Sequence, residues 1–565
     1  MSDITVDVEE LNKEVPQENP SGDFVNFYNV KTKYTGIWSW LLTTDHKRIG
    51  VMYLATMTVF FLAGLTAAFL MRFEMLTPGE TIMDPQTYNY TFTLHGIIMI
   101  FLFIIPGIPA VFGNFIMPIQ IGAEDVQFPR LNLMSYWLYL IGGLMAIGAV
   151  VYSWIEGSSP IDTGWTFYVP YSLRTSADVM VPLLAAFILG FSSILTGLNF
   201  VVTMHRLRAP GLSMWQMPLF SWGLYATAWI QVIATPVIGI TIVLVLLERA
   251  FKFGIFDPML GGDPVLFEHL FWIYSHPAVY IMILPAFGTM SDVIATFARR
   301  QIFGYKAMVL SMMAIVVVGY MVWAHHMFTS GMSDFARQMF SFFTFLVGVP
   351  TGVKIFNWVA TLWRGSIKLS VPMLFALASI FLFSIGGLTG LVLGALSTDI
   401  HLHDTYFVVG HFHYVILGGI VTMFFAACHY WWPKMFNRMY NKKVASWSVA
   451  GYFVGVNVLY FPMFIMGYLG MPRRYWDYLP EYGIYHQIST VGSWILIGSI
   501  LVMMINLALA IRNGEKTTDR NPWGALTLEW TTPNPPPLLN FEEPVGKVVG
   551  GPYDYPDYSD EEEKH

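Results

Sequence analysis

The stretch VVGHFHYVILGGIVTMFFAAC, residues 408–428, carries no Asp, Glu, Lys or Arg and has two histidines near its start. A run of about 20 apolar residues is long enough to cross the hydrocarbon layer of a membrane as one helix. The rest of the chain has the same character, because 55% of its 565 residues are hydrophobic and only 12% are charged. Soluble proteins typically carry about 25% charged residues, and a share of 16% aromatic residues argues against disorder. The composition therefore excludes a soluble enzyme and predicts an all-α integral membrane protein.

Twelve transmembrane helices are predicted from such apolar runs. They cover about residues 50–71, 91–118, 134–155, 179–204, 220–247, 266–290, 307–328, 338–363, 371–396, 406–432, 445–470 and 485–511. The predicted organisation is a polar N-terminal segment (1–49) without the pattern of a cleaved signal peptide, a twelve-helix core (50–512) and an extended soluble tail (513–565) that is Pro-rich and then acidic. The single Cys excludes a disulfide scaffold.

The basic residues predict the orientation of this bundle. Most of the 30 Lys and Arg residues fall in loops on the side of the membrane that carries both termini. Because loops rich in Lys and Arg remain in the cytoplasm, we expect both termini to be cytoplasmic.

Six of the 14 histidines lie at one depth, in the outer half of the predicted bundle. They are His95, His276, His325, His326, His411 and His413. Polar side chains are costly in hydrocarbon, so a cluster at one depth implies a shared partner. Since imidazoles predominate and carboxylates are almost absent there, we expect that partner to be iron or copper, with zinc as an alternative.

Helical geometry divides these histidines among sites. His411 and His413 are separated by about 200° around a helix, so they point to opposite faces and serve different sites. His325 and His326 are about 100° apart and can share one metal, for which His276 is the obvious third ligand. His95 then pairs with a histidine of 408–428. The pattern predicts one bis-His site, one mono-His site and one three-His site, which suit a six-coordinate haem, a haem with an open position and a copper ion.

Eight motifs follow one another along about residues 40–535. They are TLHGIIM (93–99), FGNFIMPIQIGAEDVQFPRLN (112–132), WIYSHPAVYI (272–281), VWAHHM (322–327), PTGVKIFNW (350–358), HDTYFVVGHFHY (403–414), GMPRRY (470–475) and NPWGALTLEW (521–530). In this order they resemble subunit I of the haem–copper terminal oxidases, most closely the cytochrome c oxidases. The resemblance implies a catalytic subunit that reduces O₂ to water with electrons from cytochrome c and translocates protons.

The resemblance also implies roles for the histidines. His95 and His413 would ligate the low-spin haem, with Arg72 at the formyl group of that haem. His411 would ligate the high-spin haem that binds O₂. The copper facing it would be held by His276, His325 and His326. Tyr280 lies one helical turn after His276, and in the family the matching Tyr is joined covalently to that His and supplies an electron and a proton.

Further residues match positions around these centres. Arg473, Arg474 and Trp165 would lie at the haem propionates, which guanidinium groups bind well. His403 and Asp404 resemble part of a Mg²⁺ or Mn²⁺ site that a carboxylate of subunit II completes. Glu74 and Gly79 match part of an outer Ca²⁺ site.

Two proton routes are implied from the cytoplasmic side. One contains Lys354, an ionisable residue deep in an apolar span, where a charge is expensive; Thr351 and Ser291 match hydroxyl positions on this route. The other starts at an acidic residue in the loop after the second span. Its matching residues are Asp125, Asn114, Asn132, Ser192 and Ser193.

The sequence departs from the commoner family pattern next to the first copper ligand. Many members have a Glu two residues after this His, where this chain has Ala278. Tyr274 and Ser275 precede the His, which resembles the subgroup with a Tyr-Ser pair in place of the Glu. A hydroxyl does not hold charge as a carboxylate does, so we expect Tyr274 and Ser275 to relay protons through water without storing one.

The resemblance further implies cofactors, partners and a location. The cofactors would be two haems, of heme a type, one copper, Mg²⁺ or Mn²⁺, and Ca²⁺. The partners would be a copper-bearing subunit II, subunit III, cytochrome c or a cytochrome c domain, and a respiratory supercomplex, with no role for nucleic acid. We expect a multi-pass protein of the bacterial cytoplasmic (inner) membrane.

Three alternative functions remain open on the sequence. A proton-coupled transporter fits twelve spans and an intramembrane Lys, but it does not need six histidines at one depth. A nitric oxide reductase of the same superfamily places non-haem iron where the oxidases place copper and lacks the Tyr. A quinol oxidase differs mainly in its electron donor, which subunit II recognises.

Overall fold

The structure is a computed structural model that describes residues 25–556, apart from the side chain of Trp154. Within this range eleven helical segments are long and apolar enough to cross a membrane. Nine of them are single helices: α3 (His46–Glu74), α6 (Pro129–Glu156), α8 (Met180–Arg206), α9 (Leu219–Phe251), α10 (Pro264–Ala298), α12 (Asp334–Leu362), α13 (Val371–Gly394), α17 (Lys442–Tyr468) and α18 (Gly483–Asn513).

The other two long segments contain wider π-helical turns. One consists of α4 (Pro85–Ile97), η1 (Ile98–Ile104), η2 (Gly107–Gly113) and α5 (Asn114–Gln120), and the other of α15 (Tyr406–Val415), η6 (Ile416–Val421) and α16 (Thr422–Phe436). Pro106 and Pro109 have no backbone N–H to donate, which disturbs the α-helical ladder of the first segment. Such π-helical stretches frequently occur at functional sites, and both of these follow predicted haem ligands.

The seventh predicted span, 307–328, differs from the expectation. Helix α11 (Tyr305–Gly319) ends early, and the chain turns before a short 3₁₀ helix, η5 (Trp323–Met327). At 1.5 Å per residue α11 is about 22 Å long, less than the hydrocarbon layer. Non-helical backbone at membrane depth is tolerated where protein surrounds it, and Ala324 and Met327 of η5 are fully buried. With α11 the bundle has the twelve predicted helices, but His325 and His326 lie on a 3₁₀ turn rather than on a continuous span.

Short elements connect the long helices. They are α2 (Trp38–Leu41), α7 (Tyr171–Arg174), η3 (Met214–Gln216), η4 (Pro258–Leu260), α14 (Leu396–Leu402), η7 (Pro480–Tyr482), η8 (Leu528–Trp530) and the antiparallel strand pair β1 (Arg438–Met439) and β2 (Glu515–Lys516).

Aspartates mark the starts of three long helices. The side chains of Asp45, Asp84 and Asp263 each accept backbone N–H bonds from the first turn of the helix that follows. Pro85 and Pro264 follow two of these caps directly, at the position where a missing N–H costs nothing. These local signals explain why the helices begin where they do.

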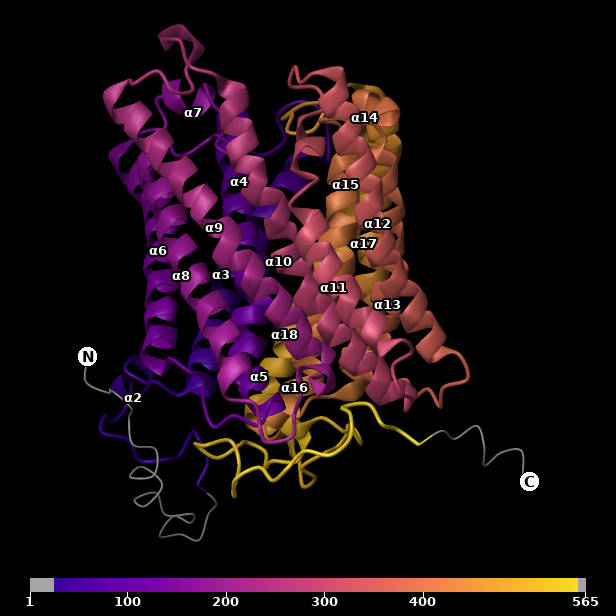
Figure 1. The fold of residues 1–565 in the computed structure, drawn as a ribbon. Coiled ribbons are helices and arrows are strands. Elements are labelled where there is room, and N and C mark those ends of the chain that lie inside the picture. The colour runs from indigo at the N-terminus through magenta and orange to yellow at the C-terminus, as the bar shows by residue number, and fades with distance from the viewer. Residues whose placement is uncertain (1–24, 557–565) are drawn as a thin grey trace.

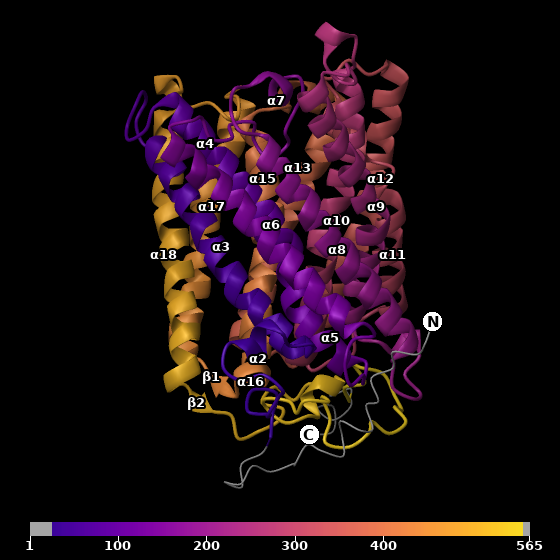
Figure 2. The same ribbon diagram turned by 90° about the vertical axis from the view of Figure 1, so that its left-hand side faces the viewer.

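The helices form one bundle, with both ends of the described chain at the same face (Figures 1 and 2). We call this face, which carries residues 25–45 and 514–556, the terminal face, and the opposite one the far face. Helix α10 lies at the centre, because 89% of its most apolar stretch is buried, compared with 17% for α12. A site enclosed by the bundle is therefore expected to include residues of α10.

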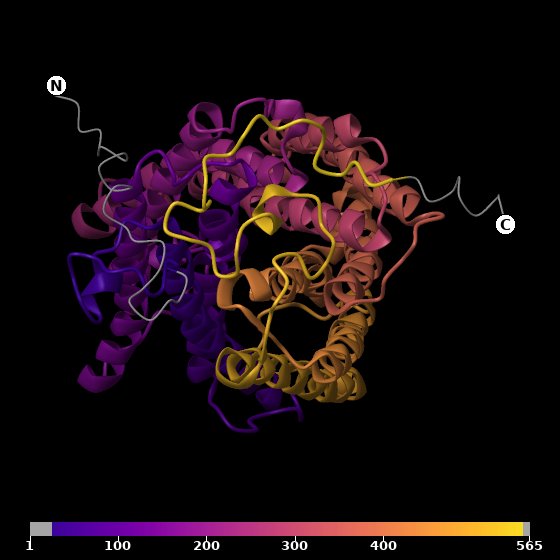
Figure 3. The ribbon, with the colours of Figure 1, turned by 90° about the horizontal axis from the view of Figure 1, so that it is seen from below.

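The C-terminal tail packs under the bundle, whereas we expected an extended soluble segment. Seen from below, it runs across the ends of many helices (Figure 3). The Lys434 ammonium of α16 donates to the Thr532 carbonyl at 2.7 Å, and the Asn540 amide donates to the Ala123 carbonyl at 2.7 Å. Buried side chains such as Trp530 explain why this Pro-rich segment is held against the protein. The acidic stretch 560–563 lies outside the described residues.

Candidate metal centre and proton routes

Three histidines converge next to the central helix. His276 comes from α10, and His325 and His326 come from η5. The His276 Nδ1 lies 3.3 Å from the His326 Nε2, and the His325 Nε2 lies 3.1 Å from the same atom. One nitrogen from each of the three rings falls within 4.8 Å of the others. The structure thus brings together the three residues predicted to share one metal.

The donor set fits a copper ion. It consists of three imidazole nitrogens, and the Nε2 of buried His276 has no hydrogen-bond partner in the described part of the chain. Neutral imidazoles suit copper, zinc and iron, and three of them leave a coordination position open. Neighbours hold the rings: Trp272 stacks on His326 with centroids 3.7 Å apart, and the Thr344 hydroxyl lies 3.1 Å from the His325 Nδ1.

Tyr280 lies beside this cluster. It follows His276 by one turn of α10, and the two ring centroids are 4.7 Å apart. Gly319, the last residue of α11, packs against the Tyr280 ring, where a methyl carbon on this glycine would lie only 2.8 Å from Cδ2. The close approach fixes the ring next to the histidines, as the Tyr280 prediction requires.

The remaining three histidines share one arrangement. His95, His411 and His413 each place Nδ1 against a backbone carbonyl, at 2.9, 2.9 and 2.8 Å respectively. A proton on Nδ1 satisfies this contact and leaves Nε2 as the ligating atom, which is how metal-binding histidines are commonly oriented. The carbonyls belong to Gly64 of α3, Gly386 of α13 and Val409 of α15, respectively. These residues therefore fit axial ligation of haem iron.

Helix α13 connects His411 to the three-histidine cluster. A methyl carbon on Gly390 would lie 2.9 Å from the His411 Cε1, and one on Gly394 would lie 2.8 Å from the Thr344 Cγ2. Thr344 is the partner of His325. Gly390, which packs on the predicted high-spin haem ligand His411, thus lies one turn of α13 from Gly394, which packs on Thr344, the partner of the predicted copper ligand His325.

Residues predicted to hold the haem propionates gather towards the far face. Trp165 packs against Gly96, the neighbour of His95, where a methyl carbon would lie 3.2 Å from the Trp165 Cβ. The Arg473 guanidinium contacts Asp404 at 2.5 Å, while its buried Nε has no partner in the described residues. The Arg474 guanidinium lies over the Phe92 ring at 5.9 Å. Two guanidinium groups with free donors suit carboxylates.

The predicted Mg²⁺ or Mn²⁺ ligands lie side by side. The His403 Nε2 is 3.9 Å from an Asp404 carboxylate oxygen, and its Nδ1 is 3.0 Å from the Asp399 carboxylate. Burial raises the pKa of the Asp399 carboxyl. Sequence reasoning missed Asp399, although its place four residues before His403 on a helix could have indicated it.

Arg72 and Glu74 are already engaged within the chain. The Arg72 guanidinium donates to the His486 and Thr490 side chains at 3.3 Å each, and its Nε has no partner in the described residues. The Glu74 carboxylate accepts three backbone N–H bonds from residues 81–83, at 2.7 to 3.0 Å. The Gly79 N–H donates to Asp477 at 2.7 Å. Glu74 therefore caps its own loop, and a Ca²⁺ ion would compete with these donors.

Lys354 is fully buried on α12, where its ammonium donates to the Met308 carbonyl at 3.0 Å. Ser291 of α10 lies one to two turns nearer the terminal face and accepts the indole N–H of Trp358 at 3.0 Å. The Thr351 hydroxyl donates to the carbonyl one turn earlier in α12. The three residues of this predicted route thus occupy the facing helices α10 and α12.

The second predicted route begins at Asp125 near the terminal face. Burial, and then Asp45, raise the pKa of the Asp125 carboxyl to about 8, while Lys47 opposes the shift. Asn114 and Asn132 are buried, and the side-chain Oδ1 of Asn114 and both side-chain amide atoms of Asn132 have no partner in the described residues. Water is the usual partner of such atoms.

Above them, Ser192 and Ser193 line a cavity of about 40 Å³. Its wall also includes Gln231 of α9, which sequence reasoning did not single out because an amide in an apolar helix carries no motif. Tyr274 and Ser275 are both buried on α10, and the Ser275 hydroxyl has no partner in the described residues.

Comparisons with known proteins agree on one family. The family model described as Cytochrome C and Quinol oxidase polypeptide I matches residues 48–495. The chain is 43% identical to cytochrome c oxidase subunit 1 of Thermostichus vulcanus over 92% of its own length and 93% of the relative's. It is 40% identical to cytochrome c oxidase subunit 1 of Bacillus subtilis, covering 91% of this chain and 82% of the relative. A solved haem–copper terminal oxidase dimer has the same fold, with a TM-score of 0.69 and 22% identity over 84% of this chain and 85% of that one.

Proposed function

The chain belongs to the family of cytochrome c and quinol oxidase polypeptide I, and on that premise we propose how its residues divide the work of a proton-translocating cytochrome c oxidase. As a member it is the catalytic subunit of a haem–copper terminal oxidase, a multi-pass membrane enzyme. The observation that carries the proposal is the convergence of His276, His325 and His326 beside Tyr280.

The ligands are assigned from the donor sets. His95 and His413 would hold a low-spin haem, and His411 would hold a high-spin haem. Both haems are proposed to be of heme a type. The copper is held by His276, His325 and His326. Bound in this way, the two haems and the copper supply the electron transfer and the binding of O₂ at an open metal position.

The chain's own residues hold these groups and move protons. Tyr280 donates its phenolic proton beside the cluster, and Arg473, Arg474 and Trp165 bind the propionates, with Arg72 at the low-spin haem. His403 and Asp404 bind Mg²⁺ or Mn²⁺ together with a partner subunit, and Glu74 with Gly79 is proposed for Ca²⁺, against the competing N–H donors described above.

Protons reach the site from the terminal face, which we assign to the bacterial cytoplasm. One route passes Ser291, Lys354 and Thr351 towards Tyr280. The other starts at Asp125, and its further residues are Asn114, Asn132, Ser192, Ser193, Tyr274 and Ser275. The apolar interior supports this assignment, because a proton crosses hydrocarbon only along placed polar groups or water.

The proposed partners are subunit II, which delivers electrons, subunit III, and cytochrome c or a cytochrome c domain, within a respiratory supercomplex. The twelve-helix core (50–512), between the two terminal segments, is proposed to be the catalytic core that binds the two haems and the facing copper.

The test is oxygen consumption by the purified complex with reduced cytochrome c, compared with a quinol. Consumption with cytochrome c alone supports the proposed donor, and consumption with quinol alone overturns it. Metal analysis should find copper in the parent and a loss of copper with the haems retained in His325→Ala. A second non-haem iron in place of copper would indicate nitric oxide reduction.

A further inference from the structure

A water-sized cavity with several polar lining residues lies against α8, enclosed also by α3, α6, α9 and residues 101–110. Its volume of about 40 Å³ is lined by Ser192, Ser193 and Thr196 of α8 and by Gln231 of α9, among apolar side chains. A cavity holds one water once it exceeds about 10–15 Å³ and offers two or more polar partners. This one therefore has room for about two waters.

Buried polar atoms without partners continue beyond this cavity. They are the Ser193 Oγ, the Gln231 Oε1, the Thr235 Oγ1 and the Ser275 Oγ, none of which has a hydrogen-bond partner in residues 25–556. Gln231, Thr235 and Ser275 are only 3%, 1% and 2% exposed. Leaving such an atom unpaired costs about 1–3 kcal/mol, so internal water is the expected partner of each.

The register of α9 against α10 places Gln231 opposite Ala278. The Thr227 hydroxyl of α9 donates to the Ile281 carbonyl of α10 at 3.5 Å. The helices are antiparallel and rise equally per residue, so one turn further along α9 corresponds to one turn back along α10. Gln231 then lies at the level of Ala278, where the commoner family pattern has a Glu.

Another turn places Thr235 at the level of Ile273, so Tyr274 and Ser275 lie at heights between Gln231 and Thr235. The Thr235 side chain also meets α8, because a methyl carbon on Gly190 would lie 3.3 Å from the Thr235 Cγ2. Gln231 contacts α8 in the same way, at 3.0 Å from a methyl carbon on Gly197. Both side chains thus lie along the α8–α9 interface that the two serines occupy.

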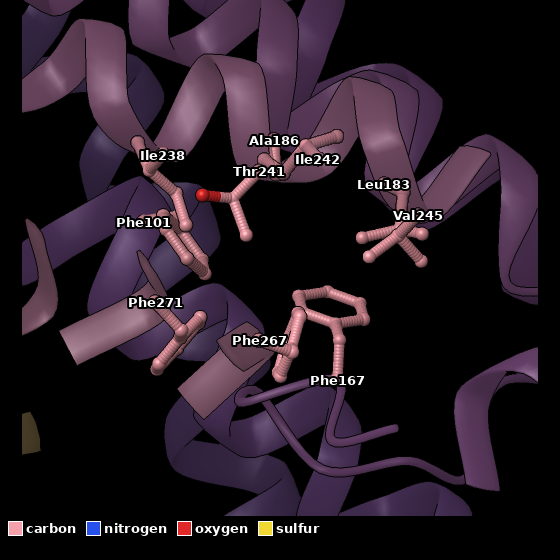
Figure 4. Close-up of a pocket in the computed structure, with 10 residues that line it drawn as sticks. All are labelled: Phe101, Phe167, Leu183, Ala186, Ile238, Thr241, Ile242, Val245, Phe267 and Phe271. Atoms are coloured by element: carbon pink, nitrogen blue, oxygen red, sulfur yellow. The ribbon is translucent and has the colours of Figure 1, made fainter. Parts of the chain in front are cut away.

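The polar path ends on α9 after Thr235. The next cavity towards the far face, about 10 Å³, is lined almost entirely by apolar side chains such as Phe101 and Phe271 (Figure 4). Its single hydroxyl, that of Thr241, donates to the Val237 carbonyl within its own helix at 2.8 Å. This lining offers water no free polar partner, whereas the unpaired Ser275 hydroxyl lies on α10, so α10 is the direction that the buried polar atoms favour.

We propose, on the basis of the oxidase function above, that Gln231 and Thr235 order the water that carries protons from Ser193 past Ala278 to Ser275. The two residues supply hydrogen-bond partners for water near Ala278, where the carboxylate of the commoner family pattern is absent. Each water and hydroxyl in the chain accepts a proton at its oxygen and donates its own to the next oxygen, so a proton enters at one end as another leaves. The Gln231 Oε1 only accepts a hydrogen bond from this water, and no side chain stores charge. Gln231 and Thr235 are positioning residues for this step.

The test compares Gln231→Leu and Thr235→Val with Thr241→Val in the intact oxidase reconstituted into vesicles. Thr241→Val is the matched control, because it makes the same substitution on the same helix at a hydroxyl bonded to its own backbone. We expect Gln231→Leu and Thr235→Val to slow turnover about tenfold and to lower the number of protons pumped per electron. The expected loss is smaller than the roughly 100-fold or greater contribution of a proton-transfer group itself, because these residues only position the water. Thr241→Val should match the parent.

Two further readouts separate a role in the route from general damage. The Lys354 route runs along α10 and α12 towards Tyr280 and does not include Gln231 of α9. Anaerobic reduction of the haem–copper site, if supplied with protons by that route, should therefore proceed at the parental rate in Gln231→Leu and be slowed in Lys354→Met. The double variant Asp125→Asn with Gln231→Leu should be no slower than Asp125→Asn alone, because both changes block one path. Parental turnover and pumping in Gln231→Leu, or additive losses in the double variant, would overturn the inference. If the parent enzyme consumed no oxygen, that result would instead refute the proposed function.

Discussion

Gly390 offers a selective test of the role proposed for His411. In Gly390→Ala the new methyl carbon would lie 2.9 Å from the His411 Cε1, 3.6 Å from Nδ1 and 3.7 Å from Nε2. Carbon atoms pack best at about 3.5–4.0 Å, so the ring must shift by about 0.6 Å or more. The Gly386 carbonyl holds its Nδ1 at 2.9 Å and resists this shift.

The expected cost follows from these contacts. Overpacking a buried site typically costs about 1–3 kcal/mol, and weakening the Nδ1 hydrogen bond adds about 0.5–1.5 kcal/mol. A loss of about 2 kcal/mol at the iron–histidine bond corresponds to about 30-fold weaker ligation, since 1.4 kcal/mol is tenfold. His95 and His413 lie outside these contacts, so the low-spin haem should be unaffected.

The assay is carbon monoxide binding to the reduced enzyme, followed by visible absorption. Carbon monoxide binds the haem with an open position, so its binding reports on the high-spin site while the low-spin band serves as internal standard. Gly387→Ala is the matched control, because a methyl carbon there meets nothing within 4 Å. We expect weakened or substoichiometric carbon monoxide binding only in Gly390→Ala. Identical spectra and oxygen consumption in the two variants would refute the assignment of His411.

Three other perturbations test the remaining parts of the site. Lys354→Met should preserve folding, because it removes a buried ammonium without much change in volume, yet lower turnover about 100-fold or more; near-parental oxygen consumption would contradict the Lys354 route. Gly319→Ala should lower turnover while metal analysis finds normal copper, because the methyl carbon would lie 2.8 Å from the Tyr280 Cδ2 and not against a ligand. The raised pKa of Asp125 means that its folded carboxyl keeps a proton which the unfolded chain releases between about pH 4 and 8. Melting temperature should therefore fall as pH rises through that window, and the fall should be smaller in Asp125→Asn.

Much of the bundle could be predicted because the membrane imposes a simple rule. Charge-free runs of about 20 residues must form helices in lipid unless they belong to a closed barrel. The exact starts were not predicted: the second span was expected from about residue 91, whereas its helix begins at Pro85 after the Asp84 cap. The break after Gly319 could not be predicted from the sequence, because residues 320–328 contain no Gly, Pro or charged residue that would mark the end of a helix. The docking of the tail was also missed, since its partners, such as Ala123 and Lys434, are distant in sequence.

For the site, a two-residue spacing was enough to predict that His411 and His413 serve different centres. Both residues do lie on one helix, α15, and their rings meet different neighbours, Gly390 of α13 and Tyr460 of α17, while the centre that each one serves stays a prediction. The grouping of His276 with His325 and His326 is confirmed as geometry, while the metal each site holds stays a prediction. Gln231 and Thr235 could not be found from sequence, because an amide or hydroxyl in an apolar helix gains meaning only from the neighbour it faces.

The docked tail has a consequence for how the protein is made. Residues 514–556 contact the Ala123 loop, the Pro210 loop and α16, which come from the first, second and last thirds of the chain. Because a chain is synthesised from its N-terminus, this segment leaves the ribosome after all the helices that it contacts, and its complete docking surface exists only once those helices are in place. A chain with a missing or misplaced helix would lack part of the surface on which residues 514–556 dock, and this segment would then be open to proteases. Protection of residues 514–556 from proteolysis would therefore indicate that the helices have assembled correctly.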